Sequence, residues 1–269
     1  MLPLLRACWA QAHHVVALAI LVALFALAGP ASAATNVSGT ISTNTTWTLA
    51  NSPYVMVGGV TVAAGVTLTI DPGVVVQGDA PTRQLVVNGS LSAIGTAAQP
   101  ITFTSTADSG PGQWYRIVFQ SAGGASTLKY ANVRYGGGSA VSTANGMVDI
   151  DAGTVTIEES TFTQSSVSGV KISGTGSVVV RRSKFEGNGF VGTELHGDGL
   201  NALNGRAVIE DSAFWSNAID GIAFTVSTSE TPSPPEVSGS SSQGNGRYGV
   251  YVWQATGADA LAPDGNVAG

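Results

Sequence analysis

The chain has 269 residues, of which only 10% are charged, and its 17 Asp+Glu outnumber its 11 Lys+Arg to give a formal net charge of −6. This composition provides no basic stripe to neutralise phosphates, which argues against a nucleic-acid partner. The sequence contains a single cysteine, so an internal disulfide is excluded.

Residues 1–33 have the pattern of a secretory signal peptide. Arg6 and two histidines precede the apolar run 15–29, which is shorter than the ~20 residues that a membrane-spanning helix needs. Ala31-Ser32-Ala33 then provides a small-residue cleavage site. We therefore expect a mature chain that begins at Ala34, lacks Cys8, does not span a membrane, and is secreted or displayed at the cell surface.

Residues 34–112 predict an N-terminal cap and the first turns of a β-rich fold. Short segments such as 66–70 (VTLTI) alternate apolar and polar residues, and turn residues such as Asp71-Pro72-Gly73 and Asn88-Gly89 separate them. Each segment is three to five residues long, which is typical of strands and too short for helices.

Residues 113–253 are dominated by a repeat. Within 155–252 the template Φ-x-x-S-x-F-x-x-N-x-x-x-G-Φ-x-Φ, in which Φ is apolar, begins at Ile157, Val180, Ile209 and Val237. Serine recurs at Ser160, Ser183, Ser212 and Ser240, and phenylalanine at Phe162, Phe185 and Phe214. The next position is Ser165 in the first repeat and an asparagine in the others, Asn188, Asn217 and Asn245. Glycine follows at Gly169, Gly192, Gly221 and Gly249. A less regular copy precedes them, with Leu128, Val133, Gly136 and Ala140-Val141 in the corresponding positions.

A period of 20 to 30 residues built from short strands predicts a parallel β-helix, an all-β solenoid in which each turn of chain stacks on the previous one. Equivalent residues then lie above one another about 4.8 Å apart. We expect a serine stack, an aromatic stack and a ladder of asparagine amides, with the glycines at backbone bends. Two longer loops, 193–208 and 227–235, fall between the same template positions and are expected on one side of the coil. Residues 254–269 lose the pattern and are expected to form an incomplete rung or a tail.

Four segments of the sequence match a known pattern: 60–76 (VTVAAGVTLTIDPGVVV), 91–104 (LSAIGTAAQPITFT), 112–119 (GQWYRIVF) and 126–138 (STLKYANVRYGGG). In these segments the sequence resembles secreted bacterial right-handed parallel β-helix proteins of the pectate-lyase-like superfamily. The resemblance implies a right-handed, single-stranded coil, consistent with the general preference of parallel crossovers. It implies no particular activity, because the superfamily includes pectate lyases, polygalacturonases, epimerases, adhesins and non-catalytic surface proteins.

The most prominent charges occur as adjacent pairs at equivalent positions of three repeats. One predicted column contains Lys129, Glu158, Arg181 and Glu210, and its neighbour contains Tyr130, Glu159, Arg182 and Asp211. Alternating signs favour a structural ladder that fixes the register. The alternative is a catalytic or uronate-binding patch, for which the candidate residues are Arg181, Arg182, Lys184, His196, Asp198, Glu210 and Asp211.

Two other candidate sites contain few residues. Asp149 and Asp151 alternate along one strand, so both carboxylates are expected to face outward as candidate calcium ligands, although calcium needs six or more oxygens. His196 is the one imidazole near a carboxylate, Asp198, after residue 33, which makes it a candidate for proton transfer. The catalytic motifs of the enzymes with this fold are absent or incomplete, and we therefore transfer no catalytic residue from them.

Two functions are compatible with these patterns. We expect a secreted or cell-surface β-helix protein with a structural, adhesive or carbohydrate-contacting role, without catalysis and without a cofactor apart from the calcium candidate. The partner would be a polysaccharide or another cell-surface component. The alternative is a polysaccharide lyase or glycoside hydrolase that acts on an acidic polysaccharide.

Overall fold

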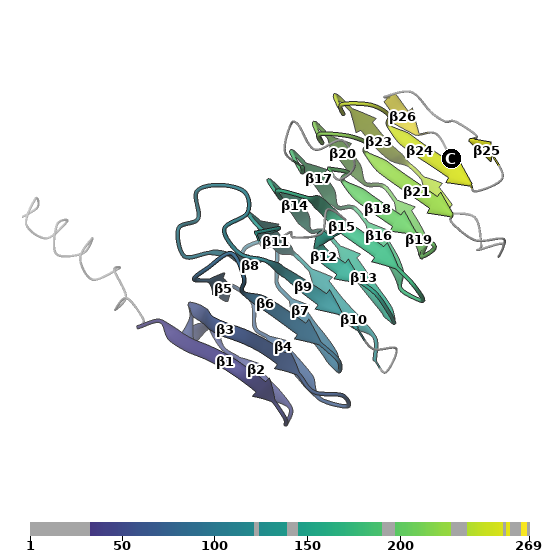
Figure 1. Ribbon diagram of the computed structural model, residues 1–269. Helices are drawn as coiled ribbons and strands as arrows, with labels where there is room; N and C mark the ends of the chain where they lie inside the picture. The colour runs from purple at the N-terminus through teal and green to yellow at the C-terminus, as the bar shows by residue number, and fades with distance from the viewer. Residues whose placement is uncertain are drawn as a thin grey trace, which may run out of the picture. The chain divides into compact units, whose positions relative to one another are not determined.

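The protein is described by a computed structural model that covers residues 33–120, 124–138, 145–189, 197–226, 236–254, 257–258 and 265–267. Residues Ala34–Gly269 form one unit. In the described part of this unit the regular elements are β-strands and one short 3-10 helix, η1 (Leu49–Asn51), and the strands follow one another as stacked rungs (Figure 1).

The strands belong to two hydrogen-bonded sheets. The eight-stranded sheet contains β2 (Thr45–Trp47), β4 (Thr67–Ile70), β7 (Ser90–Ile94), β10 (Ser126–Lys129), β13 (Thr154–Glu158), β16 (Ser177–Arg181), β19 (Arg206–Glu210) and β22 (Glu236–Ser238). The eighteen-stranded sheet contains β1 (Thr35–Ile41), β3 (Tyr54–Val62), β5 (Val75–Gly78), β6 (Gln84–Val87), β8 (Ile101–Ser105), β9 (Arg116–Phe119), β11 (Ala131–Arg134), β12 (Gly146–Ile150), β14 (Thr161–Thr163), β15 (Ser168–Ser173), β17 (Lys184–Glu186), β18 (Leu200–Leu203), β20 (Ala213–Trp215), β21 (Ile222–Val226), β23 (Ser240–Gln243), β24 (Val250–Gln254), β25 (Gly257–Ala258) and β26 (Gly265–Val267).

Each complete rung uses three strands. In the rung formed by β13, β14 and β15, each strand pairs in parallel with the strand three places later, β16, β17 and β18. The larger sheet therefore consists of two rows of strands, which are joined into one sheet because the long strand β3 pairs with both β5 and β6. This arrangement confirms the predicted parallel β-helix and the predicted strands of the 34–112 region.

The interior is formed by the alternating apolar residues of every strand. Phe162, Phe185 and Phe214 are completely buried, and their rings stack with centroids 4.9 and 4.7 Å apart and interplanar angles of 8° and 5°. These distances match the spacing between neighbouring strands. The predicted aromatic stack is confirmed, and it fixes the three rungs in register.

A buried serine ladder turns the chain from the eight-stranded sheet into the next strand. The backbone N–H of Ser160 donates to Ser183 Oγ, that of Ser183 to Ser212 Oγ, and that of Ser212 to Ser240 Oγ, each at 3.1 Å. Each hydroxyl also donates to the carbonyl two residues earlier in its own rung, as Ser212 Oγ does to Glu210 O at 2.8 Å. The serines therefore provide partners for backbone groups at a bend where the strand ladder is interrupted.

An asparagine ladder performs the same task at the next bend. Asn188 Nδ2 donates to Asn217 Oδ1 at 3.0 Å, and Asn217 Nδ2 donates to Asn245 Oδ1 at 2.9 Å. Each of these amides also donates to a backbone carbonyl of the rung before it, as Asn188 Nδ2 does to Phe162 O at 3.0 Å. The predicted amide ladder is confirmed.

The glycine column corrects one part of the predicted alignment. The strand register pairs Val170 with Leu200 and Leu200 with Ile222, so Gly199 occupies the position that the template assigned to Gly192. Gly192 itself lies outside the described residues. The same correction applies to Ala140-Val141, because Val148 pairs with Val170. In both rungs, residues inserted before the third strand hide the true equivalence.

These glycines are needed for space. A Cβ atom on Gly199 would lie 2.8 Å from Phe214 Cδ1 and 3.0 Å from Asn217 Nδ2, and one on Gly169 would lie 3.0 Å from Asn188 Nδ2. The aromatic stack and the amide ladder therefore occupy the volume that a side chain would fill. Packing therefore requires glycine at these two positions. The sequence predicts glycine in this column for a different reason, a backbone bend.

The expectation for the two longer loops is also corrected. The predicted loop 193–208 contains β18 and most of β19, and residues 190–196 and 227–235 connect different pairs of strands. They therefore do not fall between the same two positions of the rung. Near the C-terminus, β26 pairs antiparallel with β23, and β25 pairs antiparallel with β24. The chain thus reverses its direction against the last rung at these positions.

Replacing the central ring of the aromatic stack tests the core. We expect Phe185→Ala to lower the free energy of unfolding by about 3–5 kcal/mol, because the change leaves a cavity between two rings. Thr163→Ala, on the outer face of the neighbouring strand β14, is the matched control and should change it by no more than about 0.5 kcal/mol. Urea unfolding curves measure both, and equal effects would contradict the stacked core.

Candidate functional site

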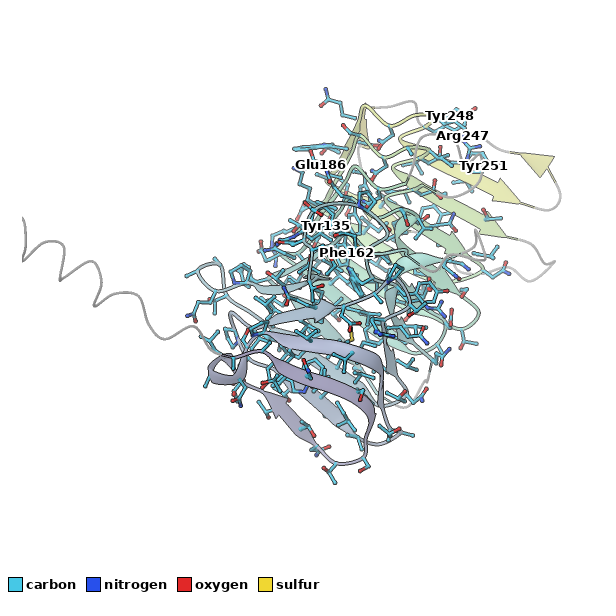
Figure 2. The ribbon with its side chains drawn as sticks, turned by 60° about the vertical axis from the view of Figure 1, so that its left-hand side comes forward. Tyr135, Phe162, Glu186, Arg247, Tyr248 and Tyr251 are labelled. Atoms are coloured by element: carbon cyan, nitrogen blue, oxygen red, sulfur yellow. The ribbon has the colours of Figure 1, made fainter. Side chains whose placement is uncertain are left out.

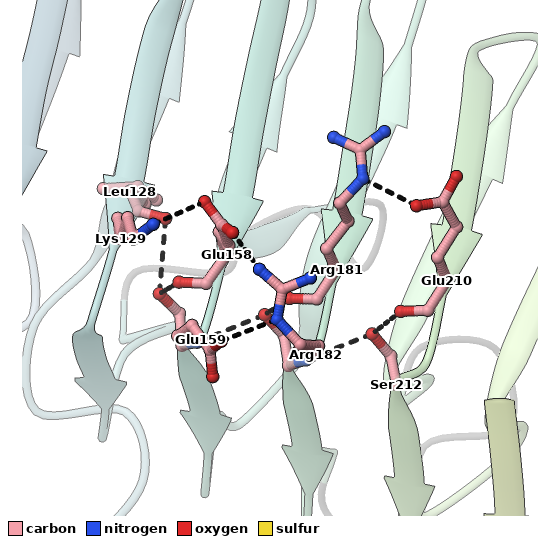
Figure 3. Close-up of polar contacts among 10 residues, drawn as sticks. Leu128, Lys129, Glu158, Glu159, Arg181, Arg182, Glu210 and Ser212 are labelled. Carbon is pink, nitrogen blue, oxygen red and sulfur yellow. Dashed lines mark hydrogen bonds and ion pairs between the residues drawn. The ribbon is translucent and has the colours of Figure 1, made fainter. Parts of the chain in front are cut away.

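The first predicted charge column is confirmed by the strand register. Lys129 pairs with Glu158, Glu158 with Arg181, and Arg181 with Glu210 on successive strands of the eight-stranded sheet. Lys129 Nζ lies 2.9 Å from Glu158 Oε2, and Arg181 Nε lies 2.6 Å from Glu210 Oε2 (Figure 3). The side chains of Arg181 and Glu210 are 40% and 37% exposed, so this column is an outer-surface feature.

The second predicted column lies at the adjacent bend. Tyr130, Glu159, Arg182 and Asp211 have φ angles of 47°, 50°, 46° and 49°, and Gly239 continues the column with φ 57°. These left-handed residues turn the chain from one sheet to the next, a conformation that is uncommon for residues other than glycine.

Arg182 links the two columns. Its Nε lies 2.6 Å from Glu159 Oε1, and its Nη2 also contacts the Glu158 carboxylate (Figure 3). The hydrogen bond from Lys129 is the main cause that lowers the pKa of Glu158, and the Arg182 guanidinium adds to the effect. Glu158 is thus held between two cations, Lys129 and Arg182, as a member of a charge ladder is.

The other members of the predicted patch lie apart from this array or make different contacts. Lys184 Nζ pairs with Glu186 Oε2 at 2.7 Å and lies 4.8 Å from the centroid of the Trp215 ring. Asp211 is exposed, and its backbone N–H donates to Ser238 O. His196 lies outside the described residues.

The two calcium candidates have different environments. Asp149 is 1% exposed and pairs with Arg116, and one of its oxygens accepts the Gly146 N–H at 2.6 Å. Burial raises the pKa of Asp149, and the Gly146 and Arg116 bonds act in the opposite direction. Asp151 accepts a hydrogen bond from Ser173 Oγ at 2.7 Å. Asp149 therefore alternates with the core residues Val148 and Ile150, as an outward position does, but neighbouring groups cover it. In the described part of the chain, no three His, Cys, Asp or Glu side chains are grouped to hold a metal ion.

Asp198 is part of a buried cluster that the repeat template does not reveal. Asp198 and Asp220 occupy equivalent positions before β18 and β21, and they are 2% and 0% exposed. Asp198 Oδ1 accepts the Asp220 N–H at 3.1 Å, and Asp220 Oδ1 accepts the Tyr248 N–H at 3.1 Å. These carboxylates therefore form a third ladder, in which each supplies an acceptor to the backbone of the following rung.

The carboxylates of Asp198 and Asp220 differ in the groups that donate hydrogen bonds to them. Asp220 forms a double hydrogen bond with Arg247, from Nε at 3.0 Å and from Nη2 at 2.6 Å. Among the residues that the structure describes, the side chain that donates to Asp198 is uncharged: Asn201 Nδ2, at 2.7 Å. Burial raises the pKa of Asp198 to about 6, opposed by the Asn201 bond, and the nearby Asp220 charge raises it further. The repeated Asp-Gly at 198–199 and 220–221 is the sequence signal that identifies this ladder.

Comparison with known families agrees with this architecture. The family described as a right-handed β-helix region matches residues 117–259, and a pectate-lyase-like β-helix domain matches residues 39–150. The first match covers more than half of the chain, and the protein therefore belongs to the right-handed β-helix family. No curated protein and no solved structure matches it. Among the residues that the structure describes, no helix is long and apolar enough to cross a membrane.

A charge exchange tests the structural role of the first column. We expect Arg181→Glu to lower the free energy of unfolding by about 1 kcal/mol, because it places three carboxylates next to one another in register. Exposed ion pairs contribute about 0.2–1 kcal/mol each, and like charges in register cost a similar amount. Adding Glu210→Arg should restore part of the loss, because it re-forms the pair between positions 181 and 210, and 1 M salt should reduce the difference. A double variant as unstable as the single one would contradict the ladder.

The pH dependence of stability tests the buried carboxylate. Between its ordinary value of 3.8 and about 6, Asp198 binds its proton more tightly in the folded state than in the unfolded state. The free energy of unfolding contributed by this group therefore rises as the pH falls through 6, by up to roughly 3 kcal/mol at about 1.4 kcal/mol per pKa unit. Asp198→Asn should reduce this rise in urea unfolding experiments at about pH 7.5 and 5. An unchanged pH dependence in the variant would show that Asp198 has an ordinary pKa.

Proposed function

We propose that the protein is a secreted or surface-displayed β-helix with a non-catalytic scaffold role, built to present an uncharged, hydroxyl-rich surface to a carbohydrate or another surface component. The observation that carries the proposal is the pairing of lysine and arginine side chains with carboxylates of the same chain. Of the 11 Lys+Arg, Arg6 lies outside the described residues. Nine of the remaining ten form ion pairs with a carboxylate: Arg83, Arg116, Lys129, Arg134, Arg181, Arg182, Lys184, Arg206 and Arg247. The tenth, Lys171, also has an interaction partner.

This pairing supports a scaffold because it leaves the described cations engaged within the protein. An enzyme that binds an acidic polysaccharide needs cations directed at the uronate carboxylates. Here such a ligand would have to displace an internal carboxylate at each contact. The charged side chains are therefore better suited to holding rungs in register than to gripping a polyanion.

The lyase or hydrolase alternative has one observation in its favour. Burial raises the pKa of Asp198 to about 6, which lies in the range of a working general acid or base. Its side chain is 2% exposed, however, and its oxygens accept hydrogen bonds from Asn201 and from the Asp220 backbone. A polymer substrate has no direct access to this carboxylate, so the alternative is the weaker of the two.

Incubation with polysaccharides tests the absence of catalysis. We expect the purified mature chain to release neither unsaturated nor reducing ends from pectin, alginate or polygalacturonate, with or without calcium. An active pectate lyase assayed in parallel would establish the detection limit. Release of either product that is abolished by Asp198→Asn or by Arg181→Glu would overturn the proposal and identify the catalytic group.

A further inference from the structure

An aromatic surface lies at β24, the third strand of the last complete rung. Tyr248 and Tyr251 stack with ring centroids 5.8 Å apart and an interplanar angle of 10°, and Tyr248 is 37% exposed. The Arg247 guanidinium carbon lies 4.5 Å from the Tyr251 ring centroid and 5.5 Å from that of Tyr248. Figure 2 shows the three labelled side chains grouped beside β24. We refer to Arg247, Tyr248 and Tyr251 as the tyrosine platform.

The platform is held in place from below. Asp220, which is fully buried, bonds Arg247 through both carboxylate oxygens and also accepts the Tyr248 backbone N–H. The Arg247 side chain is nevertheless 46% exposed. A planar guanidinium that is fixed by two parallel bonds loses little further freedom when a ligand binds, which is the condition for a preorganised site.

The neighbouring rung leaves room for the platform. Tyr251 on β24 pairs with Ala223 on β21, and Ala223 pairs with Asn201 on β18. Ala223 is 3% exposed despite its position on the outer face. A small residue at this position lets a large ring lie close to the sheet, and the next residue of the column is an amide that donates and accepts hydrogen bonds.

We propose that the tyrosine platform binds the pyranose rings of a neutral polysaccharide. This inference rests on the proposed scaffold function and assigns it a ligand class and a site. The apolar C–H face of a sugar packs against a tyrosine ring, because such rings combine a large apolar face with a polar edge. Two of the five N–H donors of Arg247 bond to Asp220, and the other donors are suited to sugar hydroxyls.

The charge of the site selects against acidic ligands. The Arg247 cation is neutralised by Asp220, and Asp198 lies beneath the same cluster. The chain as a whole has a net charge of −6. A uronate or a phosphate would therefore meet a neutral-to-negative surface, which also disfavours a nucleic acid. Hydroxyl groups carry no such penalty.

Affinity gel electrophoresis tests the proposal with the mature chain. We expect retardation in gels that contain hydroxyethylcellulose, xyloglucan or galactomannan, and no retardation in polygalacturonate. Tyr251→Ala and Tyr248→Ala should each weaken binding roughly tenfold, measured as the dissociation constant from the dependence of mobility on polysaccharide concentration. Tyr251→Phe should retain most of the affinity, because it keeps the ring.

Control variants separate a local effect from misfolding. Tyr130→Ala, at the bend between the two sheets, and Trp215→Ala, on the face formed by β20, should bind as tightly as the unchanged protein. Urea midpoints for all variants establish that they fold. The proposal is overturned if none of the three neutral polymers retards the protein, if polygalacturonate binds more strongly, or if folded Tyr251→Ala and Tyr248→Ala bind normally. These outcomes concern binding alone and leave the question of catalysis to the product-release assay.

Discussion

The structure depends on one constraint: a chain that turns between sheets must still provide a partner for every buried backbone N–H. Within strands, the parallel ladder meets this need, but at the bends the ladder is interrupted. Here columns of identical or similar side chains meet it instead. The serine and asparagine ladders, and the shorter Ser168, Asp198 and Asp220 column, all accept the N–H of an equivalent residue in a neighbouring rung.

This solution requires the rungs to stay in register, and the apolar interior supplies most of the energy that keeps them there. Stacked phenylalanines and fully buried Leu, Ile and Val residues hold the coil together. The exposed charges add a smaller contribution that depends on register, since a shift by one residue would separate Arg181 from Glu210. Charged residues that resemble a catalytic patch in the sequence are therefore explained by the geometry of stacking. The same constraint buries Asp198 and Asp220, fixes Arg247, and orients the tyrosines beside it.

The sequence predicts those parts of the fold in which spacing is constant. Ser160 to Phe162 and Ser183 to Phe185 occupy the same strand and bend, so the fixed interval reports true equivalence. The prediction fails where the rungs differ in length, because an insertion before the third strand shifts the real partner of Gly169 from Gly192 to Gly199. In such cases the equivalent residue is identified by the hydrogen-bonded pairing of the strands, and not by the number of residues along the chain. The role of Arg247 is not predicted for a related reason, because its pairing with Asp220 joins two rungs across a bend and has no local motif. Asp149 has a local pattern that suggests exposure, but its burial depends on its tertiary surroundings.

The central claim is that equivalent residues rise by one strand spacing per rung, whatever the length of the rung. Electron paramagnetic resonance measures this with pairs of spin labels, from dipolar line broadening at the short spacings and by the pulsed method at the long ones, on the outward column Thr69, Ser92, Thr127, Thr156, Val179 and Val208. With one label at Thr69 and the second moved along the column, the distances should increase in equal steps of about 4.8 Å. The label at Val208, five steps away, should therefore lie at roughly 24 Å. Distances that grow with the number of intervening residues, or that fail to grow at all, would contradict the in-register coil.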